Sequence, residues 1–314
     1  MNTDPPVTRS GVYTSGNILL ICGISAAYLL LAWLLVGFKA EQVFLVAFFN
    51  LFYFVSGPTR RFVIAFSIFI LYWIIFDFMK AFPNYRFAEV HIADLYTAEK
   101  RIFGVSFNGE RITPNEYWLR NGNGFLDILT GLFYLTWIPV PLGFAVYLYF
   151  KNRKQFFYFS LTFFLVNLLG FVIYYAYPAA PPWYVQQHGF VFYPHTPGNT
   201  AGLGRFDRYF HTGVFKSIYA KSSNIFAAMP SLHAAYPVIV LYYGLKCRLG
   251  LINGVFSLIM GGIWFSAIYN SHHYTLDILI GILCAFTGIS LFNLAMAKNG
   301  WLGRLVKRLE RITA

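Results

Sequence analysis

The chain has 314 residues, of which 58% are apolar, 21% are aromatic and only 11% are charged. A soluble domain carries roughly 25% charged residues, so this composition excludes an ordinary soluble protein and indicates a membrane protein. The net charge of +12 would suit a nucleic-acid partner, but the positions of the basic residues favour a membrane topology signal instead.

Eight apolar segments are predicted to cross a membrane as helices, which takes roughly 20 residues each. They comprise residues 18–38, 43–55, 62–79, 126–150, 156–177, 233–246, 251–270 and 275–296. The second and sixth are short and could be re-entrant, so six or seven spans remain possible. The predicted fold class is all-α, a polytopic transmembrane helix bundle with about eight spans.

Two polar stretches, residues 80–125 and 178–232, lie between these spans. They are too long for simple turns, and long ordered connections commonly carry function. The first span follows a polar leader without a convincing cleavage site, which is typical of an uncleaved anchor. Three cysteines lie in or beside apolar segments, which favours packing over a disulfide or metal set. They are Cys22, Cys247 and Cys284.

Four basic clusters fall on one side of the predicted bundle, together with the N-terminus. They lie at residues 60–61, 151–154, 246–248 and 298–311. The positive-inside rule makes this side cytoplasmic and places both chain termini there. The clusters then report topology and contact with anionic lipid rather than a specific partner. Both polar stretches and the turn at 270–275 face the opposite side, which is periplasmic, extracellular or lumenal.

A Pro-Ser-Leu-His motif at residues 230–233 begins the sixth apolar segment. Ser231 is predicted to cap the N-terminus of this helix, and His233 would lie in its first turn. Free backbone N–H groups in such a turn can bind an anion. An interfacial histidine on a helix that is merely capped is an equally good interpretation of this motif alone.

A second motif, His-His-Tyr-Thr-Leu-Asp at residues 272–277, precedes the last apolar segment. On a helix, the four-residue spacing brings His273 and Asp277 to one face. The carboxylate would accept one ring N–H and leave the other nitrogen free for proton transfer or covalent phosphoryl transfer. A hydrogen-bonded pair that only fixes the last helix is the alternative. His272 would point about 100° away from His273 and have a supporting or interfacial role.

The polar stretch before His233 offers candidate phosphate contacts. The planar guanidinium of Arg205 could clamp a phosphate, whereas a structural contact of Arg205 or Arg208 with Asp207 is the alternative. Residues 178–184 contain helix-stopping prolines and an aromatic pair that suits the lipid headgroup layer. A metal bound by Asp277 and the histidines of the two motifs is less favoured, because adjacent histidines rarely ligate one ion.

Together these motifs resemble the type 2 phosphatidic acid phosphatase superfamily, in which Pro-Ser-x-His is followed about forty residues later by His-x-x-x-Asp. The likeness is closer to its inositolphosphotransferase branch, which includes the fungal inositol phosphorylceramide synthases. It covers roughly residues 178–281, and the rest fits more loosely through Pro114-Asn115-Glu116 and Leu126-Asp127. The stretches that carry it are Ala180-Pro181-Pro182-Trp183-Tyr184, residues 202–207 and 227–233, and His272-His273-Tyr274 with Asp277.

The resemblance implies a six-helix catalytic core with additional N-terminal helices, in which two non-cytoplasmic segments cap the site. It implies that His273 is the nucleophile that becomes phosphohistidine and that Asp277 orients it. His233 would protonate the leaving alkoxide and then activate the incoming hydroxyl, and this scheme needs no metal or other cofactor. The expected substrate-binding residues are Arg205, Ser231, Pro182, Trp183, Tyr184 and His272.

Two departures from the family pattern favour a transferase over a phosphatase. The Lys…Arg-Pro phosphate motif of the phosphatases has no counterpart in the sequence, and Ser266 precedes Ala267 where they carry Ser-Arg. Arg205 matches an arginine in the motif of the transferase branch and is the natural substitute for the missing phosphate ligands.

We therefore expect N-terminal anchor helices over residues 1–61, a catalytic membrane domain over 62–297 and a basic cytoplasmic tail over 298–314. The expected reaction transfers a phosphoinositol-type group from a phospholipid donor to the hydroxyl of a lipid or glycolipid acceptor. A lipid phosphate phosphatase that uses water is the alternative. A transporter with proton-relay histidines is disfavoured because the two halves show no repeat. No nucleic-acid partner is expected, and a partner subunit is left open.

Overall fold

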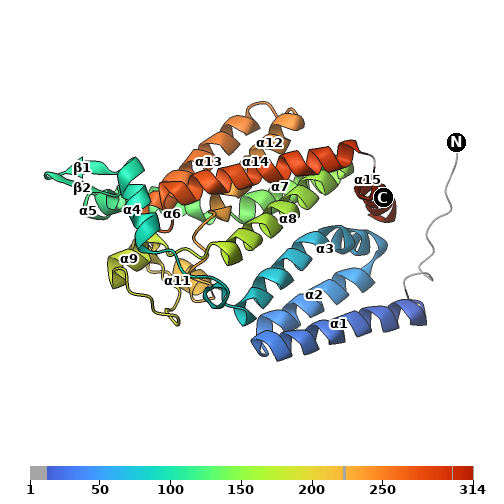
Figure 1. The fold of residues 1–314 in the computed structure, drawn as a ribbon. Coiled ribbons are helices and arrows are strands. Elements are labelled where there is room, and N and C mark those ends of the chain that lie inside the picture. The colour runs from blue at the N-terminus through green and yellow to red at the C-terminus, as the bar shows by residue number, and fades with distance from the viewer. Residues whose placement is uncertain (1–12, 222–223, 299, 314) are drawn as a thin grey trace. The chain divides into compact units, whose positions relative to one another are not determined.

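The protein is built almost entirely of helices in a computed structural model (Figure 1), which describes residues 13–221, 224–298 and 300–313. The chain divides into two compact units. One contains the chain up to Phe82 and from Arg304 onward, and the other contains Pro83–Gly303. These two units differ from the predicted domains, whose limits are 61/62 and 297/298, because the third helix belongs to the N-terminal unit. The limits of the catalytic domain stay a prediction.

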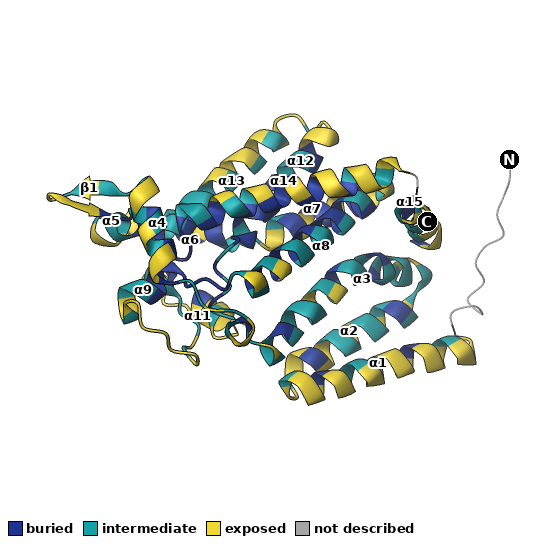
Figure 2. Cartoon of the chain, viewed as in Figure 1, coloured by how far each residue is buried: buried dark blue, intermediate teal, exposed yellow. Residues whose placement is uncertain are grey.

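The N-terminal unit contains α1 (Ser15–Val36), α2 (Ala40–Val55) and α3 (Gly57–Phe78), joined by short connections. Ser56 caps α3, because its side chain accepts a hydrogen bond from the backbone N–H of Thr59. Figure 2 shows that most of α1 is exposed, as an apolar helix that faces lipid would be. The small core of this unit contains Ile21, Tyr53 and Val63.

The end of the chain, predicted as a basic tail, forms the helix α15 (Trp301–Thr313). Basic side chains recur along it between apolar ones, so one face is charged and the other apolar. Such a helix is suited to lie in the membrane interface. Its basic residues are Arg304, Lys307, Arg308 and Arg311.

Six apolar helices form the main bundle within the described part of Pro83–Gly303. They are α6 (Gly124–Leu135), α7 (Pro139–Lys151), α8 (Arg153–Ala176), α12 (Leu232–Lys246), α13 (Ile252–Tyr269) and α14 (Thr275–Ala297). Helix α12 packs against α8, α13 and α14 and is therefore central. Figure 2 shows buried positions along α8, and α1 has fewer of them.

Six helical segments of the described chain are long and apolar enough to cross a bilayer. They comprise residues 15–36, 57–81, 124–151, 153–176, 252–269 and 275–297. Helices α2 and α12 are shorter, at 16 and 15 residues, so all eight predicted segments are helical and the second and sixth are short. The predicted span over 126–150 is confirmed, but a turn divides it into two helices. Pro139 has no N–H to continue α6, and residues 136–138 form a turn before α7.

The first polar stretch folds as η3 (Asn84–Arg86), α4 (Ala93–Phe103), β1 (Val105–Phe107), β2 (Glu110–Ile112) and α5 (Pro114–Arg120). β1 and β2 form an antiparallel hairpin around Asn108 and Gly109. Both of these residues have positive φ, which a two-residue type I′ turn requires. Among the described residues, this hairpin is the departure from the all-α prediction.

The second polar stretch contains α9 (Pro182–His188), η4 (Ala201–Leu203), α10 (Gly204–Tyr209) and α11 (Val214–Tyr219). Backbone bridges join it to the first stretch. Parallel bridges connect His91 with Ala179 and Ala179 with Ala227. The second bridge includes a hydrogen bond from the N–H of Ala228 to the carbonyl of Ala179, at 3.3 Å. The ladder fixes the backbone just before the Pro-Ser-Leu-His motif.

Helices α12 and α14 meet at their N-terminal ends, where their backbones come unusually close. The N–H of Ser231 donates to the carbonyl of Asp277 at 2.9 Å. At Gly281, a Cβ atom would lie only 2.1 Å from the carbonyl oxygen of Ser231. Only glycine fits there, and its absence of a side chain lets the two helix starts touch.

Candidate active site

Ser231 caps α12 as predicted, because its side-chain oxygen accepts the N–H of Ala234 at 3.3 Å. Ser231 is completely buried and closes the end of the helix rather than facing open space. His233 therefore lies in the first turn of α12, at the point where α12 and α14 touch. The helix cap thus determines where this imidazole sits.

His233 and His273 lie in direct contact, although forty residues separate them. The Nδ1 atom of His233 lies 3.1 Å from the Nε2 atom of His273, and the ring centroids are 5.4 Å apart. The two histidine motifs thus form one site. The Nδ1 atom of His273 lies 3.0 Å from the carbonyl oxygen of Ala228. Because a carbonyl only accepts, Nδ1 carries the hydrogen and Nε2 keeps a lone pair that faces His233.

Asp277 lies within reach of His273 as predicted, but it does not accept the ring N–H. Its Oδ2 atom lies 3.6 Å from the Nδ1 atom of His273, within ion-pair range but beyond a hydrogen bond. Helix α14 begins only at Thr275, so His273 precedes the helix. Oδ2 instead accepts the backbone N–H of Tyr274, at 2.8 Å, and caps the helix. The carboxylate supplies negative charge close to the imidazole, while Ala228 holds the ring.

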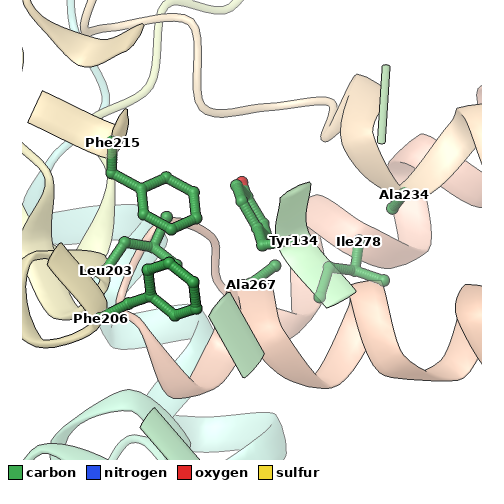
Figure 3. Close-up of a cluster of buried hydrophobic side chains, with 7 residues drawn as sticks. All are labelled: Tyr134, Leu203, Phe206, Phe215, Ala234, Ala267 and Ile278. Atoms are coloured by element: carbon green, nitrogen blue, oxygen red, sulfur yellow. The ribbon is translucent and has the colours of Figure 1, made fainter. Parts of the chain in front are cut away.

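Aromatic residues at the end of α6 and in the turn before α7 contact His233. The hydroxyl of Tyr134 lies 3.2 Å from the Nδ1 atom of His233. The ring of Trp137 meets the same imidazole edge-on, with centroids 4.4 Å apart. Figure 3 shows Tyr134 between Phe215 and Ile278 in a buried apolar cluster. The last turn of α6 and the turn that follows it therefore bring two aromatic side chains to the site.

His272 is turned away from the histidine pair, in keeping with the predicted supporting role. Its Nε2 atom donates to the carbonyl of Thr200 at 2.9 Å, and its ring stacks on Tyr219 with centroids 4.5 Å apart. Burial, helped by the nearby imidazole of His273, lowers the pKa of His272 to about 3. His272 is therefore neutral at physiological pH. The hydroxyl of Tyr219 contacts that of Tyr134, which links this layer to His233.

Arg205 pairs with Asp127 on α6, and the predicted alternative contact with Asp207 does not form. Its Nε atom lies 2.5 Å from Asp127 Oδ1, which also accepts the hydroxyl of Tyr269 at 2.7 Å. Asp207 instead accepts the backbone N–H of Lys216, at 2.9 Å. One terminal nitrogen of Arg205 is buried without a hydrogen-bond partner in the described part of the chain. Arg205 thus keeps a donor available for an anion.

This free nitrogen lies beside the histidine turn. A Cβ atom at Gly202 would come within 2.9 Å of the Nη2 atom of Arg205 and within 2.6 Å of the side-chain oxygen of Asn270. The N–H of Gly202 also donates to the carbonyl of Asn270 at 3.0 Å. The absence of a side chain at Gly202 therefore lets Arg205 approach the turn that carries His273.

Pro182, Trp183 and Tyr184 begin α9 and are buried in the core of the polar stretches. The composition suggested an aromatic anchor in the headgroup layer, which is wrong because Trp183 and Tyr184 are only 5% and 0% exposed. Their side chains pack with Ile92 and Phe226. The backbone N–H of Trp183 donates to the carbonyl of Ser271 at 3.0 Å, so this segment supports the histidine turn.

Two supports for the turn were missed by the sequence interpretation. The carboxylate of Glu99 on α4 accepts the backbone N–H groups of Thr275 and Leu276, at 2.9 and 3.1 Å. Burial raises the pKa of Glu99, and the charge of Asp277 contributes to that rise. The side chain of Asn115 donates at 2.9 Å to the carbonyl of His273. No local sequence pattern pairs either residue with the turn.

Within residues 13–221, 224–298 and 300–313, no group of three or more His, Cys, Asp or Glu side chains is placed to hold an ion. The nitrogen atoms of His233 and His273 face each other instead.

Comparison with known proteins identifies the family. The chain matches the PAP2 superfamily over residues 106–291. It is 44% identical over 283 residues to the phosphoinositol dihydroceramide synthase of Bacteroides thetaiotaomicron, covering 89% of this chain and 92% of that protein. It is 33% identical over 130 residues to the inositol phosphorylceramide synthase of Candida albicans, covering 41% of this chain and 27% of that protein.

A third relative is the catalytic subunit of inositol phosphorylceramide synthase from Saccharomyces cerevisiae, at 27% identity over 221 residues. That match covers 69% of this chain and 53% of the relative. No solved structure matches the chain. The family match extends over more than half of the sequence and includes both histidine motifs. The chain is a membrane enzyme of the PAP2 superfamily.

Proposed function

We propose that this enzyme transfers phosphoinositol from a phosphoinositol phospholipid to the primary hydroxyl of a ceramide-type lipid such as dihydroceramide. The observation that carries the proposal is the 3.1 Å contact between His233 Nδ1 and His273 Nε2 at the touching ends of α12 and α14. The name of the Bacteroides relative, which is 44% identical over 89% of this chain, supports the choice of group and acceptor.

In the first displacement, the Nε2 lone pair of His273 attacks the phosphorus of the donor. A nitrogen–phosphorus bond forms as the bond from phosphorus to the diacylglycerol oxygen breaks. His233, in its protonated imidazolium form, gives the proton on Nδ1 to the departing alkoxide, so diacylglycerol leaves as a neutral alcohol and His233 becomes a neutral imidazole. The Ala228 carbonyl and the negative charge of Asp277 stabilise the ring of His273 as it acquires positive charge.

In the second displacement, His233 takes the proton of the acceptor hydroxyl, whose oxygen attacks the same phosphorus. The nitrogen–phosphorus bond breaks, and His273 regains its lone pair. The free nitrogen of Arg205 is suited to bind a phosphate oxygen in both steps, since charge-assisted contacts of guanidinium with phosphate are strong. Both imidazoles end in their starting protonation states, so the cycle is complete.

Transfer rather than hydrolysis requires that an acceptor alcohol outcompete water. Tyr134 and Trp137 cover His233, and Tyr134 is completely buried within an apolar cluster. An active site lined in this way disfavours water during the lifetime of the phosphohistidine. The basic clusters at the opposite helix ends support a site on the non-cytoplasmic face, with both termini in the cytoplasm.

The test uses purified protein with inositol-labelled phosphatidylinositol and dihydroceramide. We expect a labelled phosphoinositol ceramide, no product from His273→Ala, and a labelled protein intermediate when the acceptor is omitted. The variant must insert and purify like the wild type for the comparison to count. Release of free inositol phosphate as the main product would identify a hydrolase, and wild-type turnover by His273→Ala would refute the nucleophile.

A further inference from the structure

The Nδ1 atom of His233 has two partners at nearly equal distances. The Nε2 atom of His273 lies 3.1 Å from it, and the hydroxyl oxygen of Tyr134 lies 3.2 Å from it. An imidazole nitrogen carries at most one hydrogen, so Nδ1 can form a well-directed hydrogen bond as a donor to only one of these atoms at a time. The contact with Tyr134 takes no part in the two displacements above.

The contact with His273 occupies the lone pair that the reaction needs. Because His273 carries its hydrogen on Nδ1, the lone pair of its Nε2 atom faces His233. Reacting atoms must come within about 3–3.5 Å of each other before a bond forms. The Nδ1 atom of His233 already lies at 3.1 Å on that side, so it stands where the phosphorus must approach. His233 therefore has to leave this contact before the first displacement.

Tyr134 is the better-held member of its contact with His233. Its side chain is completely buried, and its ring stacks on that of His272 with centroids 5.6 Å apart. Its hydroxyl also contacts the hydroxyl of Tyr219, and a phenol can donate to one partner while it accepts from another. His233, in contrast, is only partly buried. A small movement of the imidazole can therefore redirect its Nδ1–H from His273 to an oxygen that stays in place.

We propose that Tyr134 is a positioning residue whose hydroxyl accepts the Nδ1–H of His233 and so uncovers the lone pair of His273 for the donor phosphorus. This inference rests on the proposed phosphoinositol transfer. The nitrogen–phosphorus bond then forms as the bond from phosphorus to the diacylglycerol oxygen breaks. The Nδ1 proton of His233 passes to that departing oxygen. Tyr134 keeps its own proton throughout, because it only exchanges hydrogen-bond partners.

The test separates this role from general-acid catalysis by using a donor whose leaving group needs no proton. The probe is the 4-nitrophenyl ester of myo-inositol 1-phosphate, because nitrophenolate is weakly basic and gains little from an acid catalyst. The initial burst of nitrophenolate without acceptor lipid reports the first displacement alone. In Tyr134→Phe we expect the burst rate to fall about tenfold, since His233 stays in contact with His273. An unchanged burst rate would overturn the inference.

Removal of His233 distinguishes positioning from a structural role. In His233→Ala the lone pair of His273 is already uncovered, so replacing Tyr134 has nothing further to obstruct. The double variant Tyr134→Phe/His233→Ala should therefore show the same burst rate as His233→Ala. A purely structural role of Tyr134 would lower the rate in both backgrounds. Equal losses with and without His233 would overturn the inference.

The matched control is Tyr243→Phe, which also removes a buried hydroxyl. Tyr243 bonds to Thr162 at 2.7 Å and lies on α12 about 15 Å beyond His233. The control should keep the wild-type burst rate, and a loss equal to that of Tyr134→Phe would overturn the inference. Failure of the proposed function gives a different result. If phosphatidylinositol yields only free inositol phosphate, the transfer to a lipid fails, whereas a loss confined to Tyr134→Phe still supports its role in the first displacement.

Discussion

The ring of His273 is held by the backbone of Ala228, whose carbonyl oxygen lies 3.0 Å from Nδ1. Asp277, the residue four positions along the chain, lies 3.6 Å from the same atom. The tautomer that leaves Nε2 free is therefore fixed by a backbone group, and the carboxylate acts mainly through its charge. This division of roles leads to the first prediction.

Asp277→Asn should reduce kcat without abolishing transfer. The amide oxygen can still cap Tyr274, and Ala228 still holds the ring, but the charge that stabilises the positive imidazole is lost. We expect a loss of about 100-fold, less than the roughly 10⁴-fold seen where an aspartate alone fixes the tautomer. Steady-state kinetics beside His273→Ala provides the measurement. Equal losses in the two variants would contradict a separate role for the Ala228 carbonyl.

Arg205 and Asp127 should act as one unit. Asp127 anchors the guanidinium at 2.5 Å, so Asp127→Asn should displace the nitrogen that we propose binds phosphate and reduce kcat/KM about tenfold. Because the two residues work through one contact, Arg205→Gln/Asp127→Asn should lose no more activity than Arg205→Gln alone. A double-mutant cycle measures this coupling. Fully additive losses would show that Asp127 acts independently of the arginine.

Arg205→Lys offers a related check on geometry. A lysine ammonium is a compact charge and cannot pair with Asp127 while presenting a second, separately directed donor. We expect the lysine variant to resemble Arg205→Gln in its donor KM. Activity near the wild-type level in Arg205→Lys would show that charge alone suffices at this position.

Glu99→Gln should lower both stability and kcat. The carboxylate accepts two backbone N–H groups at the start of α14, and a glutamine can replace only one acceptor and none of the charge. Hydrogen bonds to charged groups contribute about 1.5–3 kcal/mol, so thermal unfolding should shift downward measurably. The control is Glu110→Gln on β2, where the side chain is exposed. If Glu99→Gln affects neither Tm nor kcat, this support is dispensable.

Acid should destabilise the enzyme partly through His272. Its pKa is about 3 in the folded protein and about 6.5 when unfolded, so the unfolded state binds more protons between these values. The stabilising contribution is complete above pH 6.5 and declines toward pH 3, by up to ~1.4 kcal/mol per pH unit. His272→Gln, which keeps a donor for Thr200, should show a smaller fall in Tm between pH 7.5 and 5.0. Identical falls in both proteins would exclude His272 as a contributor.

The proposed orientation can be tested by labelling single cysteines in a variant whose three native cysteines are replaced. A membrane-impermeant thiol reagent should label Ser217→Cys on α11 in intact cells, and should label Lys307→Cys on α15 only after the membrane is opened. Both positions are exposed in the structure. The reverse pattern would place the histidine site on the cytoplasmic side.

The sequence predicts the helical membrane fold and the residues of the histidine motifs because these signals are local. Long apolar segments locate the helices, and Ser231 identifies the start of α12 without knowledge of its neighbours. The break between α6 and α7 was missed because the apolar run continues across it, although Pro139 marks the place. Pro139 therefore ends α6 within an apolar segment that hydropathy alone predicts as one span.

The supports of the site could not be predicted, because they depend on partners far along the chain. Glu99 contacts Thr275 across 176 residues, and Tyr134 reaches His233 across 99. The role of Ala228 belongs to its backbone, which any residue type possesses, and depends on a ladder built elsewhere. The prediction that Trp183 lies in the headgroup layer is wrong because it used the residue type alone. Tryptophan suits a membrane interface, but the residues packed around Trp183 bury its side chain.

The contact between Gly281 and Ser231 has a consequence for how this enzyme can diversify. At this point the starts of α12 and α14 touch main chain to main chain, with no side chain between them. Any side chain at position 281 would push the two helix starts apart and displace His233 from His273. Position 281 must therefore stay glycine wherever the two imidazoles are to stay in contact.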